Sequence, residues 1–269
     1  MSKKIVLALA PTGGWGKSYN NPLEPNHIAE EVHSCAEEGV SLVHLHARDR
    51  EGNLTTDLDT FFKTTERIAK TCDIIIEAST GGLSNLTPQE RALPLTNKKV
   101  EVSSLNMGSL NFLDKVYINT VPDIRYWLRK MVKNSIKPSL EIFDTSNICI
   151  SNLFIKEGLI KPQYNFNFIF NYKWGMSFSL PLVEVLKSML PKEIIWGAIF
   201  GESKDFSSHL QACLQGATMI RVGFEDSRIC NNHVAKSNLD LVKEIRRELE
   251  ILGFQITKPS EARKLLGIK

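Results

Sequence analysis

The chain has few cysteines, and their spacing argues against two kinds of site. Its 269 residues include five cysteines that lie far apart and form no C-x-x-C pair: Cys35, Cys72, Cys149, Cys213 and Cys230. A disulfide framework or a thiolate zinc site requires paired or clustered cysteines. We therefore expect neither, and we expect most of these thiols to be buried packing residues.

Net charge and long apolar runs are also scarce. The 33 basic and 30 acidic residues leave a formal charge of +3, and the basic residues are dispersed, which does not favour nucleic-acid binding. The apolar stretch at residues 5–10 is short and ends at Pro11, so it indicates a strand followed by a loop rather than a signal peptide. No run could span a bilayer. We expect a soluble, cytoplasmic protein that binds neither nucleic acid nor membranes.

The chain does contain eight short apolar runs, most of them followed by a helical pattern. The runs predict strands at residues 4–10, 40–46, 73–79, 100–106, 137–143, 165–172, 194–200 and 217–224. The clearest helices are predicted at residues 26–38, 58–70, 122–134, 180–190, 205–215 and 236–252. Asn26 is expected to cap the first helix and Gly39 to follow its end.

Strands that alternate with helices indicate a parallel sheet. No G-x-G-x-x-G motif follows the first strand, which argues against a dinucleotide-binding fold. Eight strand–helix units in a chain of this length favour a closed barrel over an open doubly wound sheet. The sequence therefore predicts an α/β protein in which residues 1–269 form a single (β/α)8 TIM barrel domain.

Two histidines and a distant carboxylate form the most informative pattern. His44, His46 and Arg48 alternate at the end of the second strand, so they are expected to share one face. Glu225 follows the eighth strand, and the second and eighth strands flank the first in a closed barrel. Two imidazoles and a carboxylate there would make a three-ligand site for a divalent metal, a set that favours zinc and leaves a position open for substrate.

Arg221 and Asp226 form a second candidate unit at the same strand end. An arginine at the barrel mouth can bind a substrate carboxylate or steady a developing enolate. A carboxylate beside a metal-bound carbonyl compound can act as a general base. The alternative interpretations are a structural ion pair of Arg221 with Glu141 or Asp226, and a capping or loop role for Asp226.

Further polar residues are predicted at the carboxyl ends of the other strands, where barrel enzymes build their sites. Residues 79–82 read Ser-Thr-Gly-Gly, so Ser79, Thr80 and Gly81 offer hydroxyls and backbone N–H groups to an anion. The alternative is that this segment only makes a turn. The remaining candidates for lining the site are Ser104, Asn106 and Glu141.

These motifs occur together in a known family. They read His-Leu-His-Ala-Arg-Asp at 44–49, Ser-Thr-Gly-Gly at 79–82, Ser-Leu-Asn-Met-Gly-Ser-Leu-Asn-Phe at 104–112, Lys-Pro-Ser-Leu-Glu-Ile-Phe-Asp at 137–144 and Arg-Val-Gly-Phe-Glu-Asp at 221–226. The motifs stand in the same order as in the β-keto acid cleavage enzymes. The chain resembles this family over nearly its whole length, including residues 237–253 and 261–267.

The resemblance implies a zinc-containing (β/α)8 barrel, usually a homotetramer. Its C-acyltransferase reaction converts a β-keto acid and acetyl-CoA into acetoacetate and a new acyl-CoA by Claisen and retro-Claisen steps. By motif, the zinc ligands correspond to His44, His46 and Glu225, and Arg221 with Asp226 to the deprotonation pair. Ser79 corresponds to a substrate contact. Ser104, Asn106 and Glu141 correspond to lining positions, and Thr80, Gly81 and Arg48 are further candidates for substrate binding.

Two loops depart from the family pattern. The founding 3-keto-5-aminohexanoate cleavage enzyme has a glutamate after the first strand that recognises the substrate amine, whereas Trp15 stands here. A neutral indole cannot form that ion pair, so we expect another substrate; Trp15 could contact an apolar tail or a quaternary ammonium. After the seventh strand, residues 201–203 read Gly-Glu-Ser in place of the family's Gly-Arg, which leaves the identity of the thioester open.

Two other functions remain alternatives. A metal-dependent hydrolase could use an H-x-H strand on the same fold, but such enzymes need further histidines, and the fifth and sixth predicted strands have none. A non-catalytic homologue could instead bind a keto acid.

Overall fold

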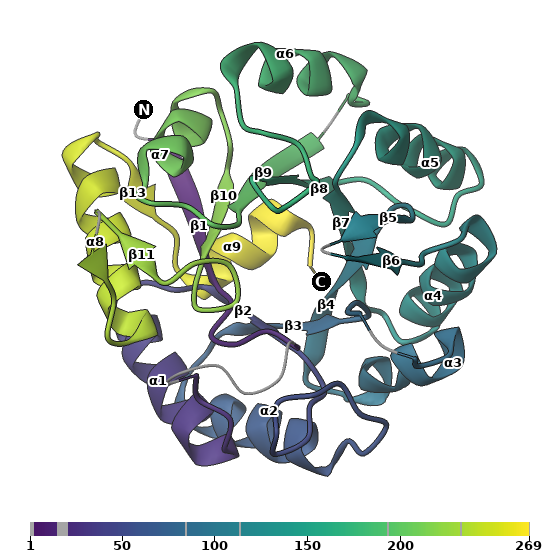
Figure 1. Cartoon of the computed structure of the whole chain (residues 1–269), viewed down its shortest axis with the longest axis horizontal. Coiled ribbons are helices and arrows are strands. Elements are labelled where there is room, and N and C mark those ends of the chain that lie inside the picture. The colour runs from purple at the N-terminus through teal and green to yellow at the C-terminus, as the bar shows by residue number, and fades with distance from the viewer. Residues whose placement is uncertain are drawn as a thin grey trace.

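A closed barrel of parallel strands organises the chain (Figure 1). The computed structural model describes residues 3–14, 21–83, 85–112, 114–192, 194–231 and 233–268. Each barrel strand pairs in parallel with the next, and the last pairs with the first, so the predicted (β/α)8 barrel is confirmed. The strands are β1 (Lys4–Leu9), β2 (Leu42–Leu45), β3 (Ile75–Ser79), β4 (Val100–Asn106), β7 (Lys137–Ile142), β8 (Tyr164–Phe170), β9 (Ile194–Phe200) and β10 (Met219–Val222).

Helices surround the barrel and connect consecutive strands (Figure 1). They are α1 (Pro25–Glu37), α2 (Asp59–Thr71), α3 (Pro88–Arg91) with the 3-10 turn η1 (Leu93–Thr96), α4 (Val121–Lys133), α5 (Thr145–Lys156), α6 (Leu180–Met189), α7 (Ser207–Leu214) and α8 (Asn238–Ile251). In the described part of the chain, no helix is long and apolar enough to cross a membrane.

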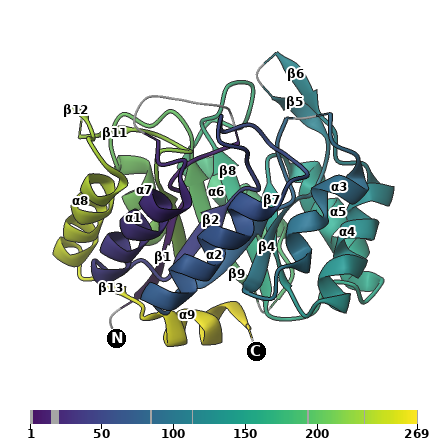
Figure 2. The same cartoon turned by 90° about the horizontal axis from the view of Figure 1, so that it is seen from below.

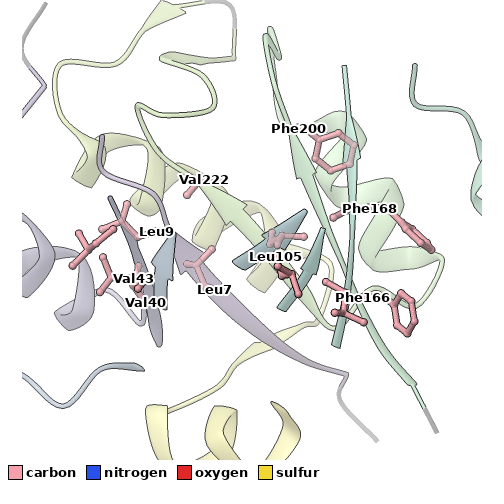
Figure 3. Close-up of a cluster of buried hydrophobic side chains, with 14 of the residues drawn as sticks. Leu7, Leu9, Val40, Val43, Leu105, Phe166, Phe168, Phe200 and Val222 are labelled. Carbon is pink, nitrogen blue, oxygen red and sulfur yellow. The ribbon is translucent and has the colours of Figure 1, made fainter. Parts of the chain in front are cut away.

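The main hydrophobic core lies between the barrel and its helices. Alternate residues of β1, Leu7 and Leu9 among them, point outward and are fully buried. Phe166 and Phe168 do the same on β8, and Figure 3 shows these side chains on the strands beside the helices. A buried side chain of this size stabilises the fold by about 1.5–3 kcal/mol. The core therefore holds the strand ends, and the polar residues on them, in fixed positions.

A second, smaller core closes the amino-terminal end of the barrel. The inward-facing residues Val6, Leu42 and Val102 pack against Ala262 and Leu266 of α9 (Pro259–Leu266). Figure 2 shows α9 beneath the barrel, on the side opposite the hairpin of β5 (Leu110–Phe112) and β6 (Lys115–Tyr117). A short strand, β13 (Gln255–Ile256), pairs with β1 just before α9. In the described part of the chain, α9 thus covers the amino-terminal end of the barrel, whereas the carboxyl end holds a cavity.

Several helix boundaries follow from capping residues. Thr120 and Ser237 begin α4 and α8, each in a reciprocal capping box with the acidic residue three positions on. The predicted cap at Asn26 is wrong, because Glu24 precedes α1 and the Asn26 side chain instead accepts a hydrogen bond from Arg67. Gly39 follows the end of α1 as predicted, one residue beyond its C-cap.

Helix α5 was not predicted, since its sequence mixes β-branched residues with asparagine and serine, which favour strands or turns. Its start is fixed by Asp144, whose carboxylate accepts a hydrogen bond of 2.8 Å from the N–H of Ser146. The sequence pattern also did not predict the hairpin of β11 (Ile229–Cys230) and β12 (His233–Val234), which follows β10.

Candidate metal centre and surrounding cavity

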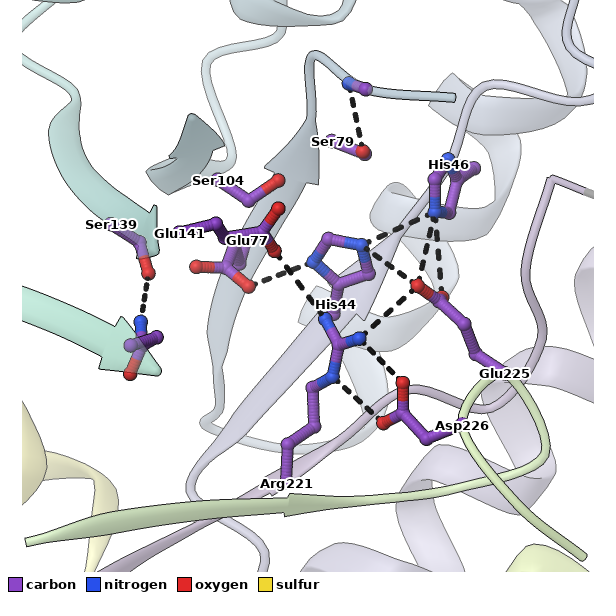
Figure 4. A network of polar contacts seen from close by, with 12 residues as sticks. His44, His46, Glu77, Ser79, Ser104, Ser139, Glu141, Arg221, Glu225 and Asp226 are labelled. Atoms are coloured by element: carbon purple, nitrogen blue, oxygen red, sulfur yellow. Dashed lines mark hydrogen bonds and ion pairs between the residues drawn. The ribbon is translucent and has the colours of Figure 1, made fainter. Parts of the chain in front are cut away.

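Three buried side chains direct their ligand atoms to one point at the carboxyl end of the barrel (Figure 4). His44 lies on β2 and His46 just beyond it, and their Nε2 atoms are 3.3 Å apart. Glu225, in the loop after β10, brings Oε1 to 3.6 Å from His44 Nε2 and 3.4 Å from His46 Nε2. All three ligand atoms lie within 4.8 Å of one another. Two nitrogens and a carboxylate so placed fit a divalent cation such as zinc.

The charges around this cluster favour a bound cation. Burial raises the pKa of Glu225, but His44, Arg221 and His46 more than offset it, so the pKa lies below its ordinary value and the carboxylate is ionised. Burial lowers the pKa of His46, which keeps its imidazole neutral and able to coordinate. Burial also opposes protonation of His44, but Glu225 and Glu77 together raise its pKa. A divalent cation would take the place of that proton.

Glu77, on β3, supports His44 from behind. Its Oε2 lies 2.8 Å from His44 Nδ1, and both side chains are almost fully buried. When Nδ1 carries the hydrogen and donates it to Glu77, the lone pair of Nε2 faces the metal cluster. Carboxylate–histidine pairs of this kind orient metal ligands and make them more basic. Sequence reasoning missed this role, although Glu77 directly precedes the Ala-Ser-Thr-Gly segment and alternates with Ser79.

Arg221, on β10, holds Asp226 through two hydrogen bonds. Its Nε donates to Oδ2 of Asp226 at 2.9 Å and its Nη2 to Oδ1 at 2.6 Å, a bidentate arrangement. Nη2 also lies 3.3 Å from Glu225, and Nη1 lies 3.8 Å from Glu141. Both ion pairs considered as alternatives for Arg221 are therefore present. Since the same guanidinium reaches the metal cluster, a structural and a functional role are compatible.

Tyr172, in the loop after β8, stands between Asp226 and the cavity. Its hydroxyl donates to Asp226 Oδ1 at 2.5 Å. Tyr172 lines the cavity, whereas Asp226 does not and its side chain is only 2% exposed. The ring lies over Gly201, where a Cβ would come within 2.8 Å of it, so the glycine allows this close approach. Sequence reasoning did not single out Tyr172, because 54 residues separate it from Asp226.

The Ser-Thr-Gly-Gly segment turns at the end of β3. Ser79 and Gly81 line the cavity, and Ser79 Oγ accepts a hydrogen bond of 3.0 Å from the N–H of Gly81. Thr80 points away and donates to the carbonyl of Ser104 at 2.7 Å. Gly82, at φ 127°, donates its N–H to the hydroxyl of Tyr117 at 2.9 Å. The segment therefore joins the metal cluster to the β5–β6 hairpin.

Ser104, Asn106 and Glu141 come from adjacent strands. Asn106 of β4 lies opposite Glu141 of β7 in the strand register, and all three residues stand at the carboxyl end of the barrel. Glu141 lines the cavity, and burial raises its pKa to about 7 although Arg221 opposes this shift. Ser104 and Asn106 are buried beside it but are not among the described lining residues.

Arg48 and Trp15 differ from the other candidates in placement. Arg48 lies behind His46 in a separate small cavity, with Leu45 and Phe61, and donates to Thr12 Oγ1 at 3.2 Å. Burial lowers the pKa of Arg48 to about 10. Trp15 lies outside the described residues.

The cavity lies at the carboxyl end of the barrel and is partly open to solvent. One set of lining residues is polar and includes the candidate metal ligands. A second set is apolar and mostly aromatic: Phe112, Tyr117, Phe143, Ile169 and Tyr172. A small carboxylic acid could therefore bind at the polar set with its remaining chain against the aromatic one.

Comparison with known proteins agrees with the motif analysis. A model of the beta-keto acid cleavage enzyme family matches residues 4–268. The 3-keto-5-aminohexanoate cleavage enzyme of Fusobacterium nucleatum is 32% identical over 275 residues, covering 100% of both chains. The 3-oxoadipate:acetyl-CoA acetyltransferase of Cupriavidus necator is 30% identical over 278 residues, covering 100% of this chain and 96% of that protein.

A solved structure supports the fold. ObcA, in a ternary complex with a C4-CoA adduct and oxalate, superposes with a TM-score of 0.79 at 18% identity, covering 93% of this chain and 68% of that one. The family predicted from the ordered motifs is thus confirmed, and with it the prediction of an enzyme. From this match over nearly its full length, the chain belongs to the β-keto acid cleavage enzyme family.

Proposed function

We propose that this protein is a zinc-dependent C-acyltransferase that converts a β-keto acid and acetyl-CoA into acetoacetate and a new acyl-CoA. The convergence of His44, His46 and Glu225 within 4.8 Å, directly beside Arg221, carries this proposal. Three protein ligands that leave coordination positions open are typical of catalytic rather than structural zinc. Relatives named for acetyl-CoA-dependent transfer support the choice of co-substrate.

His44, His46 and Glu225 would hold the metal, and Glu77 would orient His44. When bound, zinc supplies a Lewis acid that stabilises negative charge on substrate oxygens. The hydroxyl of Ser79 lines the cavity and accepts the N–H of Gly81, so its own hydrogen can be donated to a substrate carboxylate. The substrate-binding roles predicted for Thr80, Ser104, Asn106, Arg48 and Trp15 stay predictions.

Asp226 would take up the proton from the carbon between the ketone and the carboxylate by way of the hydroxyl of Tyr172, which separates it from the cavity. Arg221 holds both of its oxygens, and the hydroxyl of Tyr172 lies at Oδ1, on the cavity side. Burial raises the pKa of Asp226 although Arg221 opposes this shift, which makes the carboxylate a stronger base than a solvated one.

The carbanion would then attack the thioester carbonyl of acetyl-CoA and expel the CoA thiolate. That thiolate would attack the original ketone, and the bond between the ketone carbon and the former carbanion carbon would break. The products are the new acyl-CoA and the acetoacetate carbanion, which recovers its proton from Asp226. Atoms and protons balance without any other reactant.

Metal analysis and a coupled assay of purified protein test this proposal. Acetoacetate formation from β-keto acids should require both zinc and acetyl-CoA. His46→Ala should lose metal and activity together, whereas His33→Ala, at an exposed histidine of α1, should keep both. Turnover at the wild-type rate in metal-free protein, or a metal-replete His46→Ala variant, would contradict the ligand assignment.

The resemblance to the family further supports three proposals about the whole protein. Residues 1–269 would form one domain, the active form would be a homotetramer, and the protein would be cytoplasmic.

A further inference from the structure

The apolar lining residues form one continuous wall. Phe112 contacts Tyr117, Phe143 and Tyr172, with ring centroids 6.2, 6.2 and 5.6 Å apart. Phe143 and Tyr172 also contact each other at 6.4 Å. Rings at these separations are in tilted or edge-to-face contact, so together they present one continuous apolar surface to the cavity.

This aromatic wall (Phe112, Tyr117, Phe143, Ile169 and Tyr172) is built by three separate parts of the chain. Phe112 and Tyr117 come from the β5–β6 hairpin, which the Tyr117 hydroxyl ties to the N–H of Gly82. Phe143 follows β7 directly, and Ile169 and Tyr172 lie at and after the end of β8. Several elements therefore fix its shape together, as expected of a preformed binding surface.

The charged groups that line the cavity all belong to the Arg221 network. Leaving aside the two histidines, the charged residues among the described lining are Arg221, Glu141 and Glu225. Arg221 contacts both carboxylates as well as Asp226, so each of these charged groups already has a partner of opposite charge. Within the described lining, the wall thus offers neither a cation for a second carboxylate nor a separate anion for an ammonium group.

We propose that this site selects β-keto acids whose tail is short, aliphatic and uncharged, with the aromatic wall as the specificity-determining surface. The inference rests on the proposed function, because the polar end must bind the β-keto acid head. An unpaired charge placed against an apolar surface loses its hydration without compensation. A charge on the substrate tail is therefore expected to lower kcat/KM by about 100-fold or more relative to an uncharged tail of the same length.

Three substrates of equal chain length test this inference: 3-oxohexanoate, 3-oxoadipate and 3-keto-5-aminohexanoate. Their tails are neutral, anionic and cationic in turn. With zinc-loaded protein and acetyl-CoA, we expect 3-oxohexanoate to exceed both others in kcat/KM by about 100-fold. Equal values, or a preference for either charged tail, would overturn the proposed specificity while leaving the cleavage activity established.

Calorimetric titration of zinc-loaded protein with the same three acids, without acetyl-CoA, separates the two proposals. If no acid is turned over, the proposed reaction fails, but the order of the dissociation constants still tests the wall. Tighter binding of 3-oxohexanoate supports the inference, and equal or tighter binding of a charged acid, or no binding of any, refutes it.

A charge added to the wall should redirect the preference. Phe143 is only partly buried, so Phe143→Arg can be accommodated, and we expect it to raise the ratio of 3-oxoadipate to 3-oxohexanoate by about 100-fold. Phe143→Leu should leave this ratio within about threefold of wild type. Leu153→Arg adds the same charge on α5, where Leu153 is 40% exposed, and should not change it. An equal change in both arginine variants would show a general charge effect and contradict a role for the wall.

Discussion

Removal of the charge on Glu77 should weaken metal binding without removing any ligand. Glu77→Gln keeps a side-chain oxygen that can accept the hydrogen bond from His44 Nδ1 but removes the negative charge 2.8 Å away. Both side chains are at most 5% exposed, so solvent screens this interaction little. Loss of such a supporting carboxylate typically lowers metal affinity 10–100-fold, about 1.4–2.7 kcal/mol. Glu77→Ala also removes the hydrogen-bond acceptor of His44 Nδ1, so it should lower zinc affinity by about 100-fold or more.

Competition with a zinc chelator of known affinity measures this change in metal-free protein. Glu141→Gln is the matched control, since Glu141 is also a buried carboxylate of the barrel but pairs with Arg221 instead of a histidine. Its zinc affinity should stay within about threefold of wild type. Thermal unfolding of the metal-free variants excludes a folding defect. Zinc affinities within twofold of wild type in both Glu77 variants would refute the role assigned to Glu77.

Three further predictions address catalysis, stability and pH. Asp226→Asn should retain zinc but lower kcat by about 10²–10⁴-fold, because the amide cannot accept the substrate proton; wild-type turnover in this metal-replete variant would end its role as the base. Leu266→Ala, at a fully buried residue of α9, should lower the free energy of unfolding measured by urea denaturation by about 2–5 kcal/mol. The control Leu252→Ala, at a side chain that is 44% exposed, should lower it by at most about 0.5 kcal/mol. Equal effects of the two substitutions would contradict the role of α9 in closing the barrel. Burial against Phe200 lowers the pKa of His209 to about 3 from 6.5, so the unfolded state binds the proton more readily. The contribution of neutral His209 to the free energy of unfolding is complete above about pH 6.5 and declines as the pH falls toward 3, with a loss of about 2 kcal/mol at pH 5. The free energy of unfolding of His209→Gln should therefore fall less on acidification than that of wild type. Identical slopes of this free energy against pH would contradict the lowered pKa of His209.

The sequence alone determined the architecture and which three residues form the candidate metal cluster. Apolar runs of strand length alternate with helical patterns, and eight such units in a chain of this length favour a closed barrel over an open doubly wound sheet. His44 lies on β2 and His46 directly after its last residue, and the alternation of an extended backbone still keeps these two side chains on one face. Glu225 joins them because β2 and β10 both flank β1 in the closed sheet. Local periodicity and one topological rule were sufficient for this part of the site.

Strand periodicity failed where strands end. Arg48 was expected on the same face as the histidines, but β2 ends at Leu45, and Arg48 instead forms a bridge with Leu54 and faces a separate cavity. Beyond the last ladder hydrogen bond, the backbone no longer alternates with a period of two. Helix α5 was missed for a related reason, since its start depends on the Asp144 cap rather than on a clear apolar pattern.

Only the tertiary structure decided which polar groups touch. Glu77 meets His44 across neighbouring strands, and Tyr172 meets Asp226 across a gap of 54 residues. Such pairings depend on register, loop path and rotamer, none of which the spacing of residues along the chain encodes. The aromatic wall likewise exists only because a hairpin and two strand ends converge. The sequence thus predicts which residues reach the barrel mouth, whereas the fold determines how they pair and what they can bind.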